Sequence, residues 1–480
     1  MSKPAKKRLP VVAFLFANSL FLIAGALGAL IWANVSPDTY KNFVHFELSR
    51  LIEGPTEDGH SHDHSHLDDE KTDSGQLTDP GSAANESGHD SDGHSGAHPW
   101  TIHLLVNDLL MALFFAIAAK EVWESFLPNG ALSNPRKAMT PLLATLGGIV
   151  GPAGIYLGGA MLIGQSGWFG QEGDLGRGWA IPCATDIAFS YLVARIIFGV
   201  GHPAIAFLLL LAIADDAAGL VILAIAYPQQ AIEPIWFLLT GVAMFSAWAM
   251  RRARVMSFWP YLLVPGVLSW ISFYFSGIHA ALGLVPIIPF LPHAYTDLGI
   301  FARTELKRTD TLNAFEHWWK NPVEIILGLF GLTNAGVVLG NTGNATIIVL
   351  LGLLVGKPLG ITLFTWIAQR FFKLEMPAGM SYRHIVVLGT VAGIGFTVAL
   401  FMADAAYPMA SFSEELRDAV KMGALLSFFA GVAAFVIARA LGIRPLGVGN
   451  GDVEKSAANA STVNGGSDRA TDSSTDSCEA

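Results

Sequence analysis

The chain has 480 residues, of which 52% are hydrophobic and 14% charged, and its formal net charge at pH 7 is −10. Soluble proteins carry about 25% charged residues, so this composition excludes an ordinary soluble domain. Apolar runs recur along nearly the whole length and predict an all-α polytopic protein in a lipid bilayer. Because the basic residues are scattered over short loops, we expect no binding of nucleic acid.

The first ten residues, MSKPAKKRLP, are basic and precede an apolar stretch from Val11 to Ala33. They resemble a signal peptide, but the stretch is long and no convincing cleavage site follows, so we expect an uncleaved first helix. Hydropathy predicts twelve membrane spans along the chain. They cover residues 11–33, 101–122, 138–163, 179–199, 204–227, 234–250, 257–275, 277–293, 322–340, 345–370, 384–407 and 420–441.

Basic residues gather in every second loop of this arrangement, and the loops between them carry few cations and many acids. This pattern predicts an even number of spans with both termini in the cytoplasm. The predicted organisation has a cytoplasmic N-terminus (1–10), a transmembrane domain (11–445) containing an external loop (53–100), and a disordered cytoplasmic tail (446–480). The cations that support it are Arg136, Lys137, Arg251, Arg252, Arg254, Arg303, Lys307, Arg308, Lys320, Arg370, Lys373, Arg383 and Arg444.

The external loop 53–100 is rich in His, Asp, Gly and Ser and has no apolar period, so we expect it to be disordered. Its imidazoles and carboxylates are groups that bind divalent metals. No fixed ligand spacing is evident, however, and a solvated spacer is the reading that we favour. Half of the chain's histidines lie here: His60, His62, His64, His66, His89, His94 and His98.

The stretch from Phe207 to Tyr227 is long enough to cross a bilayer and carries two adjacent carboxylates, Asp215 and Asp216, at its centre. A charge at mid-membrane costs on the order of 3 kcal/mol or more, and two neighbouring acids also repel each other. Successive helix residues point about 100° apart, so the two side chains face different partners. The pair is either a protonated, hydrogen-bonded structural feature or a site that exchanges protons for cations.

Two other predicted spans are interrupted by polar or small residues. Residues 181–190, IPCATDIAFS, place Pro182 beside Thr185 and Asp186, and residues 391–401 contain Gly393, Gly395 and Thr397. Broken helices at membrane depth occur only where protein or a water-filled cavity satisfies the freed backbone. Oxygen ligands of mixed charge suit a hard cation, so Thr185 and Asp186 are candidate ligands.

Further charged residues leave alternatives open. Lys357 is either a lysine that reaches the membrane surface or the counter-ion of one central aspartate. Lys120, Glu121 and Glu124 lie near the inner end of the second span and are either interfacial or functional. Glu316 begins a cytoplasmic-side segment beside a histidine, a residue that titrates near neutral pH.

Six motifs occur in one order: ATDIAFS (184–190), LAIADDAAGLVILAIAY (211–227), GIHAALG (277–283), TNAGV (333–337), GKPLGI (356–361) and GIGFTVALF (393–401). Together they resemble the NhaA family of sodium/proton antiporters, from about Asn107 to Arg444. The resemblance implies twelve helices with inverted repeats, and two broken, unwound helices that cross at mid-membrane. It also implies electrogenic export of sodium or lithium in exchange for entering protons, across a bacterial inner membrane and without a cofactor.

Residue by residue, the resemblance implies that Asp215 and Asp216 are the essential pair, with Asp216 as the cation ligand. It places Thr185 and Asp186 at the crossing of the unwound segments, and it implies that Lys357 compensates the charge of Asp215.

The same resemblance assigns Glu121 and Glu316 to the response to pH. The family commonly has Gly-Leu-Glu-Val-Lys-Arg-Glu at the inner end of the second span, whereas this chain has Ala-Lys-Glu-Val-Trp-Glu-Ser at 119–125. The pH set point is therefore not carried over. The first external loop is longer than is usual in the family, where this region helps to pair protomers. The resemblance therefore implies a homodimer but does not imply that this loop forms its interface.

Three other function classes fit a pair of membrane carboxylates less well. A sodium symporter would need a pocket for an organic solute, and a channel offers no reason for adjacent titratable acids. An intramembrane aspartyl protease using Asp186 and Asp216 would need a Gly-x-Gly-Asp signature, which is missing at both residues. We therefore expect a transporter and not an enzyme.

Overall fold

The computed structural model describes residues 20–48, 101–128, 130, 135–163, 175–199, 201–293, 310–377, 379–409 and 411–445. Within these ranges the regular structure is helical, apart from one isolated antiparallel bridge between Glu47 and Thr101. The predicted N-terminal segment, the His-rich loop and the tail lie outside the described residues.

Twenty-six helical elements, several of them single turns of 3₁₀- or π-helix, follow one another in the described residues. The α-helices are α2 (Leu20–Val35), α3 (Pro37–Val44), α5 (Ile102–Leu104), α6 (Met111–Phe126), α7 (Pro135–Leu162), α8 (Ile187–Phe198), α9 (Pro203–Ala226), α10 (Phe237–Arg252), α11 (Phe258–Tyr261), α12 (Val267–Ser276), α13 (Thr311–Asn334), α14 (Asn344–Leu351), α15 (Lys357–Arg370), α16 (Tyr382–Ala392), α17 (Phe396–Ala406), α18 (Glu414–Leu426) and α19 (Ala430–Ala440). The 3₁₀- and π-helices are Leu105–Leu110, Leu175–Cys183, Pro234–Trp236, Leu262–Gly266, Ala280–Leu282, Val285–Phe290, Leu339–Asn341, Gly352–Gly356 and Ser427–Phe429.

Six helical stretches among the described residues are long and apolar enough to cross a membrane, and two bent pairs of helices raise this number to eight. The prediction of an all-α polytopic membrane protein is therefore confirmed, whereas the predicted twelve spans exceed what length and composition establish. The six stretches are Ile102–Phe126, Ala138–Leu162, Pro203–Ala226, Phe258–Ser276, Asn344–Arg370 and Glu414–Ala440.

The two bent pairs lie where the sequence predicted interruptions. Leu175–Cys183 and α8 are bent by 47°, and α16 and α17 by 52°, each at a break of three residues. The breaks meet, because the backbone N–H of Asp186 donates to the carbonyl of Ile394 at 2.7 Å. Each interrupted helix thus supplies a partner for backbone groups that lipid could not satisfy.

Glycine allows this crossing to pack closely. A Cβ atom at Gly393 would lie 2.5 Å from the carbonyl oxygen of Leu353, and one at Gly395 would lie 3.0 Å from the Leu353 side chain and 3.2 Å from the carbonyl oxygen of Ala184. The first distance is shorter than any real Cβ contact, so Gly393 has no larger substitute unless the backbone moves.

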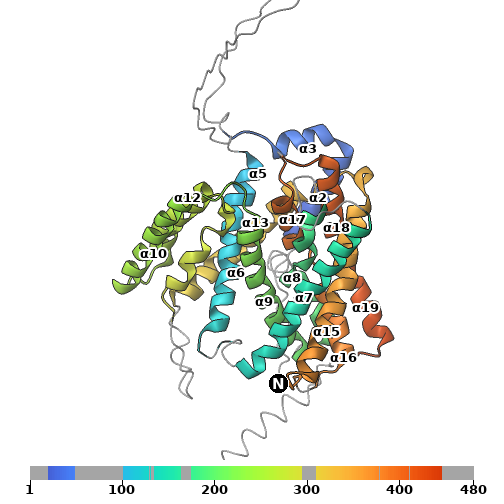
Figure 1. Cartoon of the computed structure of the whole chain (residues 1–480). Helices are drawn as coiled ribbons and strands as arrows, with labels where there is room; N and C mark the ends of the chain where they lie inside the picture. The colour runs from blue at the N-terminus through green and yellow to red at the C-terminus, as the bar shows by residue number, and fades with distance from the viewer. Residues whose placement is uncertain are drawn as a thin grey trace, which may run out of the picture.

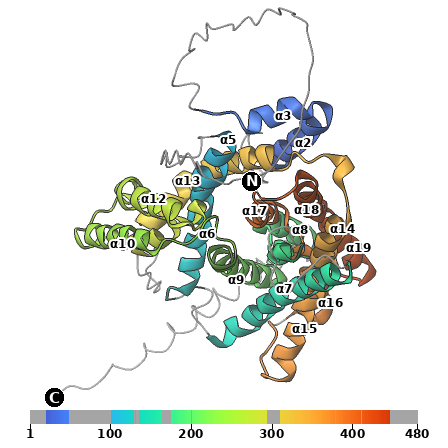
Figure 2. The ribbon, with the colours of Figure 1, turned by 45° about the horizontal axis from the view of Figure 1, so that its top comes forward.

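The helices form two groups (Figures 1 and 2). In both views α10 and α12 lie on one side and α7, α15, α16 and α19 on the other, with α6 and α9 between them. We call α2, α5, α6, α10, α12 and α13, together with the π-helix Leu105–Leu110, the α6 group, and we call α7–α9 together with α14–α19 the α17 group. The helices of each group pack extensively against one another. Inside the α17 group α7 and α15 approach closely through Gly147 and Gly360, as small residues permit in membranes.

The molecule has two ends that differ in charge. Arg251 and Arg252 lie in the last turn of α10, Arg370 in that of α15 and Arg439 in that of α19. We call this the basic end, and we call the opposite one, where α3 lies in Figure 1, the α3 end.

Candidate ion-binding site

Helix α9 carries the central carboxylates, and its start is fixed by local chemistry. Pro203 occupies the first turn, where its missing N–H costs no hydrogen bond. The Nδ1 atom of His202 accepts a hydrogen bond from the backbone N–H of Ala204 at 3.0 Å. Partial burial lowers the pKa of His202, which favours the neutral ring that can accept this bond. The apolar sequence that follows places Asp215 and Asp216 near the middle of 24 helical residues.

Asp215 has a dedicated counter-charge. The Nζ atom of Lys357, at the start of α15, lies 3.1 Å from Oδ2 of Asp215 and also donates to the carbonyl of Cys183. The lysine is fully buried, with 0% exposure, and the aspartate is 5% exposed. The ammonium therefore lies inside the protein against a carboxylate, not at the membrane surface.

Asp216 is in a different situation, although it is the next residue. Within the part of the chain that the structure describes, its carboxylate has no hydrogen bond or ion pair. The residue is partly exposed and lines a cavity of about 200 Å³. A carboxylate without a protein partner at the wall of a cavity is free to bind a proton or a cation.

Asp186 and Thr185 lie on the same cavity as Asp216. Oδ1 of Asp186 accepts from the backbone N–H of Phe189 at 3.2 Å and so caps α8, while Oδ2 accepts from the hydroxyl of Thr397 at 2.7 Å. The hydroxyl of Thr185 donates to the carbonyl of Ala392 at 3.1 Å. The bent pairs thus hold these oxygens in fixed positions opposite α9.

The cavity extends to carboxylates of α6 and α13. Its lining includes Glu121, Glu316, Lys320 and Glu324. Glu316 is bound by Lys120, a lysine of α6 that is only 3% exposed and that also pairs with Glu124 at 2.7 Å. Lys120 therefore links α6 to α13 and is more than an interfacial residue.

Toward the α3 end, aromatic side chains pack above the central aspartates. The ring centroid of Phe401 on α17 lies 4.9 Å from the ring centroid of Phe115 on α6 and 4.8 Å from that of His279. Phe115 and Phe401 also line a smaller space, of about 30 Å³, next to Asp215 and Asp216. The cavity of about 200 Å³ is thus the wider of the two spaces next to Asp216. Around the smaller space, beside Phe115 and Phe401, the packing is tight and apolar.

The structure brings most sequence candidates to one place. Asp216, Asp186, Thr185, Glu121 and Glu316 line one cavity, and Asp215 with Lys357 lies behind its wall.

Sequence reasoning missed three features. It did not assign Thr397 as the donor to Asp186, Lys120 as the link to Glu316, or Asp404 as the centre of a buried charge cluster. Asp404 could have been found, because a charged residue inside a predicted span is itself a signal.

Comparison with known proteins identifies the family. The family described as "Na+/H+ antiporter 1" matches residues 89–437. The Na(+)/H(+) antiporter NhaA of Jannaschia sp. is 48% identical over 446 residues, which is 89% of this chain and 96% of that protein. The NhaA proteins of Geotalea uraniireducens and Geobacter sulfurreducens are 42% and 41% identical, each over 89% of this chain and 96% of its own length. These relatives are transporters and not enzymes, and this chain belongs to the NhaA family of sodium/proton antiporters.

Proposed function

We propose that this sodium/proton antiporter exports sodium or lithium from the bacterial cytoplasm in electrogenic exchange for entering protons, with Asp216 as the principal ligand. Asp186 and Thr185 are the further oxygen groups of the site, and Lys357 compensates the charge of Asp215. Glu121 and Glu316 belong to the response to pH. The family resemblance supports a homodimer as well.

The observation that carries the proposal is the contrast between adjacent aspartates. Asp215 is neutralised by Lys357 at 3.1 Å, while the neighbouring carboxylate of Asp216 faces the cavity without a partner among the residues that the structure describes. A hard cation prefers carboxylate, hydroxyl and carbonyl oxygens, and the cavity offers Asp216, Asp186 and the hydroxyls of Thr185 and Thr397. No soft ligand is required for sodium.

Exchange follows because one carboxylate cannot bind a proton and a cation together. Ligation needs the charged form, so an arriving sodium ion displaces the proton and a rise in proton concentration displaces sodium. Electrogenic exchange requires more than one proton for each sodium ion. The buried Asp215–Lys357 pair is a second titratable group at the site and supports this stoichiometry.

The proposal includes twelve membrane crossings with the basic end in the cytoplasm. Besides the eight established stretches, α2, α10, α13 and Ala280–Phe290 would supply the remaining four. Arg251, Arg252 and Arg370 at the basic end support this orientation through the positive-inside rule. Both termini would then be cytoplasmic, and the two bent pairs would be the unwound helices of two inverted repeats.

The test is sodium-driven proton movement in proteoliposomes, followed with a pH-sensitive dye. The Asp216→Asn variant should lose exchange, because an amide keeps the shape but cannot titrate or supply charge. Glu414→Gln is the matched control, because that carboxylate is half exposed at the α3 end, where it pairs with Lys41. Substantial exchange by the Asp216→Asn protein would exclude Asp216 as the principal ligand.

A further inference from the structure

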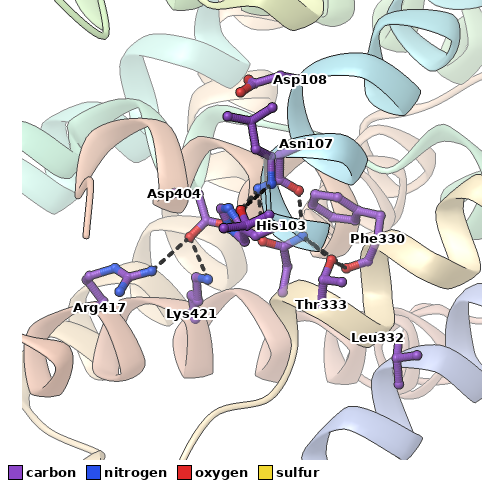
Figure 3. A network of polar contacts seen from close by, with 12 residues as sticks. His103, Asn107, Asp108, Phe330, Leu332, Thr333, Asp404, Arg417 and Lys421 are labelled. Atoms are coloured by element: carbon purple, nitrogen blue, oxygen red, sulfur yellow. Dashed lines mark hydrogen bonds and ion pairs between the residues drawn. The ribbon is translucent and has the colours of Figure 1, made fainter. Parts of the chain in front are cut away.

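A second cluster of buried charges lies where α17, α18 and α5 meet (Figure 3). Its centre is Asp404 on α17, whose side chain is 9% exposed. Oδ1 of Asp404 lies 2.5 Å from Nζ of Lys421 and 3.5 Å from a guanidinium nitrogen of Arg417, both on α18. Three charged side chains with little access to water need a reason to be there.

The other carboxylate oxygen of Asp404 faces the α6 group. It lies 3.8 Å from Nε2 of His103 and 3.5 Å from the amide nitrogen of Asn107. Asn107 is in turn bound to Asn334 of α13 by two amide hydrogen bonds, of 2.8 and 3.2 Å. Asp404 therefore bridges the two groups of helices through one oxygen on each side, as the dashed lines in Figure 3 show for Arg417, Lys421 and Asn107.

One face of α17 connects this cluster to the ion-binding site. Thr397, Phe401 and Asp404 follow one another at intervals of four and three residues, which places them on the same side of a helix. Thr397 binds Asp186, and Phe401 packs against Phe115. The same helix face thus contacts the site, closes the path toward the α3 end and bears the bridging carboxylate.

The cluster is not suited to a transported cation. Asp404 already faces two basic side chains, Lys421 and Arg417, which compensate its charge. A third cation would be repelled there. Such compensated charges suit a bridge between two bodies, because Asp404 keeps its pairing with Lys421 and Arg417 on its own side whether the bridge is closed or open.

We propose that Asp404 is a positioning residue of the exchange cycle, whose contacts with His103 and Asn107 keep the α3 end closed while Asp216 is reached through the large cavity. Alternating access requires the site to open toward one side at a time. Opening toward the α3 end would then separate α17 from α6 and break these contacts. The inference rests on the exchange function, but it does not depend on which aspartate binds the cation.

The experiment reads accessibility rather than transport. Cys183 and Cys478 are the only cysteines of the chain and are replaced by Ala and Ser, respectively. Val398→Cys is then introduced as the reporter, because Val398 lines both the large and the small cavity. A membrane-impermeant thiol reagent is applied to right-side-out and to inverted vesicles in sodium-free buffer. The labelling rate is compared between the reporter protein and its variants.

In His103→Ala and Asp404→Asn we expect labelling from the α3 end to rise about tenfold, because each change removes a polar contact of Asp404 that holds the α3 end closed. Labelling from the basic end should fall. Asp404→Glu should restore part of the original ratio. His103→Ala removes the contact of His103 with Asp404 and the bond between His103 and Asn107. It leaves the pairing of Asp404 with Lys421, so it decides the question even where Asp404→Asn does not insert.

The matched control is Glu233→Gln, which removes a carboxylate bound to Trp236 within one loop, so that no contact between the two groups is lost. Its labelling ratio should not change. An unchanged ratio in His103→Ala would overturn the proposal, and so would an equal rise of labelling from both ends, since that indicates general loosening. Because no sodium is present, these outcomes are independent of whether Asp216 is the ligand.

Discussion

Two aspartates within the membrane-spanning helices, Asp404 and Asp216, have opposite surroundings. Asp404 lies among Lys421, Arg417 and His103, whereas Asp216 lies on the wall of a cavity of about 200 Å³ without a partner among the described residues. Asp215 resembles Asp404 more than it resembles Asp216, since Asp215 is paired with the buried Lys357.

The comparison shows that position in the membrane does not by itself identify an ion ligand. All three carboxylates would be costly at membrane depth if they stood alone. Asp215 and Asp404 have a counter-charge supplied by the protein, so they stabilise the structure or are coupled to a neighbouring base. Asp216, which has no such counter-charge among the described residues, is left to bind the transported ion or a proton. The following predictions test this distinction.

The largest effect is expected from removing the counter-charges themselves. Lys357→Ala leaves Asp215 buried and unpaired, so the variant should lose about 3–5 kcal/mol of stability. Exchange should also need a more alkaline pH, because the carboxylate without its ammonium releases a proton less readily. Thermal unfolding in detergent and the pH profile of exchange measure the two effects.

Lys421→Ala is the comparison for Lys357→Ala. It should be less destabilising, because Arg417 still faces Asp404, and the pH profile of exchange should keep its midpoint. A shifted profile in Lys421→Ala, or an unshifted one in Lys357→Ala, would show that the two pairs do not have the different roles assigned here.

A second effect concerns the crossing of the bent pairs. Gly395→Leu would push a side chain toward Leu353 and toward the carbonyl of Ala184, next to the ligand oxygens. We expect transport to fall far more than the amount of inserted protein. Gly154→Leu on α7 is the matched control, because a Cβ there meets nothing within 4 Å. Equal loss of insertion and transport in Gly395→Leu would indicate a role in packing alone.

A smaller effect is expected at the wall of the cavity. Lys120→Met removes the cation that holds Glu316 and Glu124, so the cavity becomes more negative. The apparent affinity for sodium should rise by about two- to fivefold at low ionic strength and return toward the original value in high salt, since salt screens such charges. Initial rates at several concentrations of an inert salt measure this. An affinity that falls at low ionic strength would contradict the assignment.

The smallest effect is expected from the His-rich loop. Deleting residues 55–96 should leave exchange intact, because a polar segment without an apolar period cannot build a packed site. The deletion protein is compared with the complete chain in the same proteoliposomes. Loss of exchange by a correctly inserted deletion protein would show that the loop does more than separate two helices.

The sequence predicted the helical fold and the main groups of the site because membranes restrict the choices. Apolar runs have no alternative to a helix at membrane depth, and carboxylates within them are rare enough to be noticed. The interruptions around Asp186 and Gly393 were visible for the same reason.

What the sequence could not predict depends on contacts between distant helices. The bond from Thr397 to Asp186 spans 211 positions and was not predicted. The pairing of Lys357 with Asp215 joins residues 142 positions apart, and only the family resemblance chose between the two aspartates as the partner. Hydropathy also counted twelve spans where length and composition establish six to eight, because α2, α10 and α13 are short or carry polar residues. The compensation of Asp404 was likewise invisible, since its charged partners come from two other elements, α5 and α18.

The most direct test of the account is the pH dependence of sodium affinity in the unmodified protein. If sodium and protons compete for Asp216, the apparent affinity should weaken by about tenfold for each pH unit and each competing proton as the pH falls through the competition regime. Sodium concentration at half-maximal exchange, measured in proteoliposomes at several pH values equal on both sides, gives this slope. The account predicts a clear slope at acidic pH that flattens at alkaline pH, where the carboxylate is already charged. A sodium affinity that is the same at every pH would contradict a single site with competing ions.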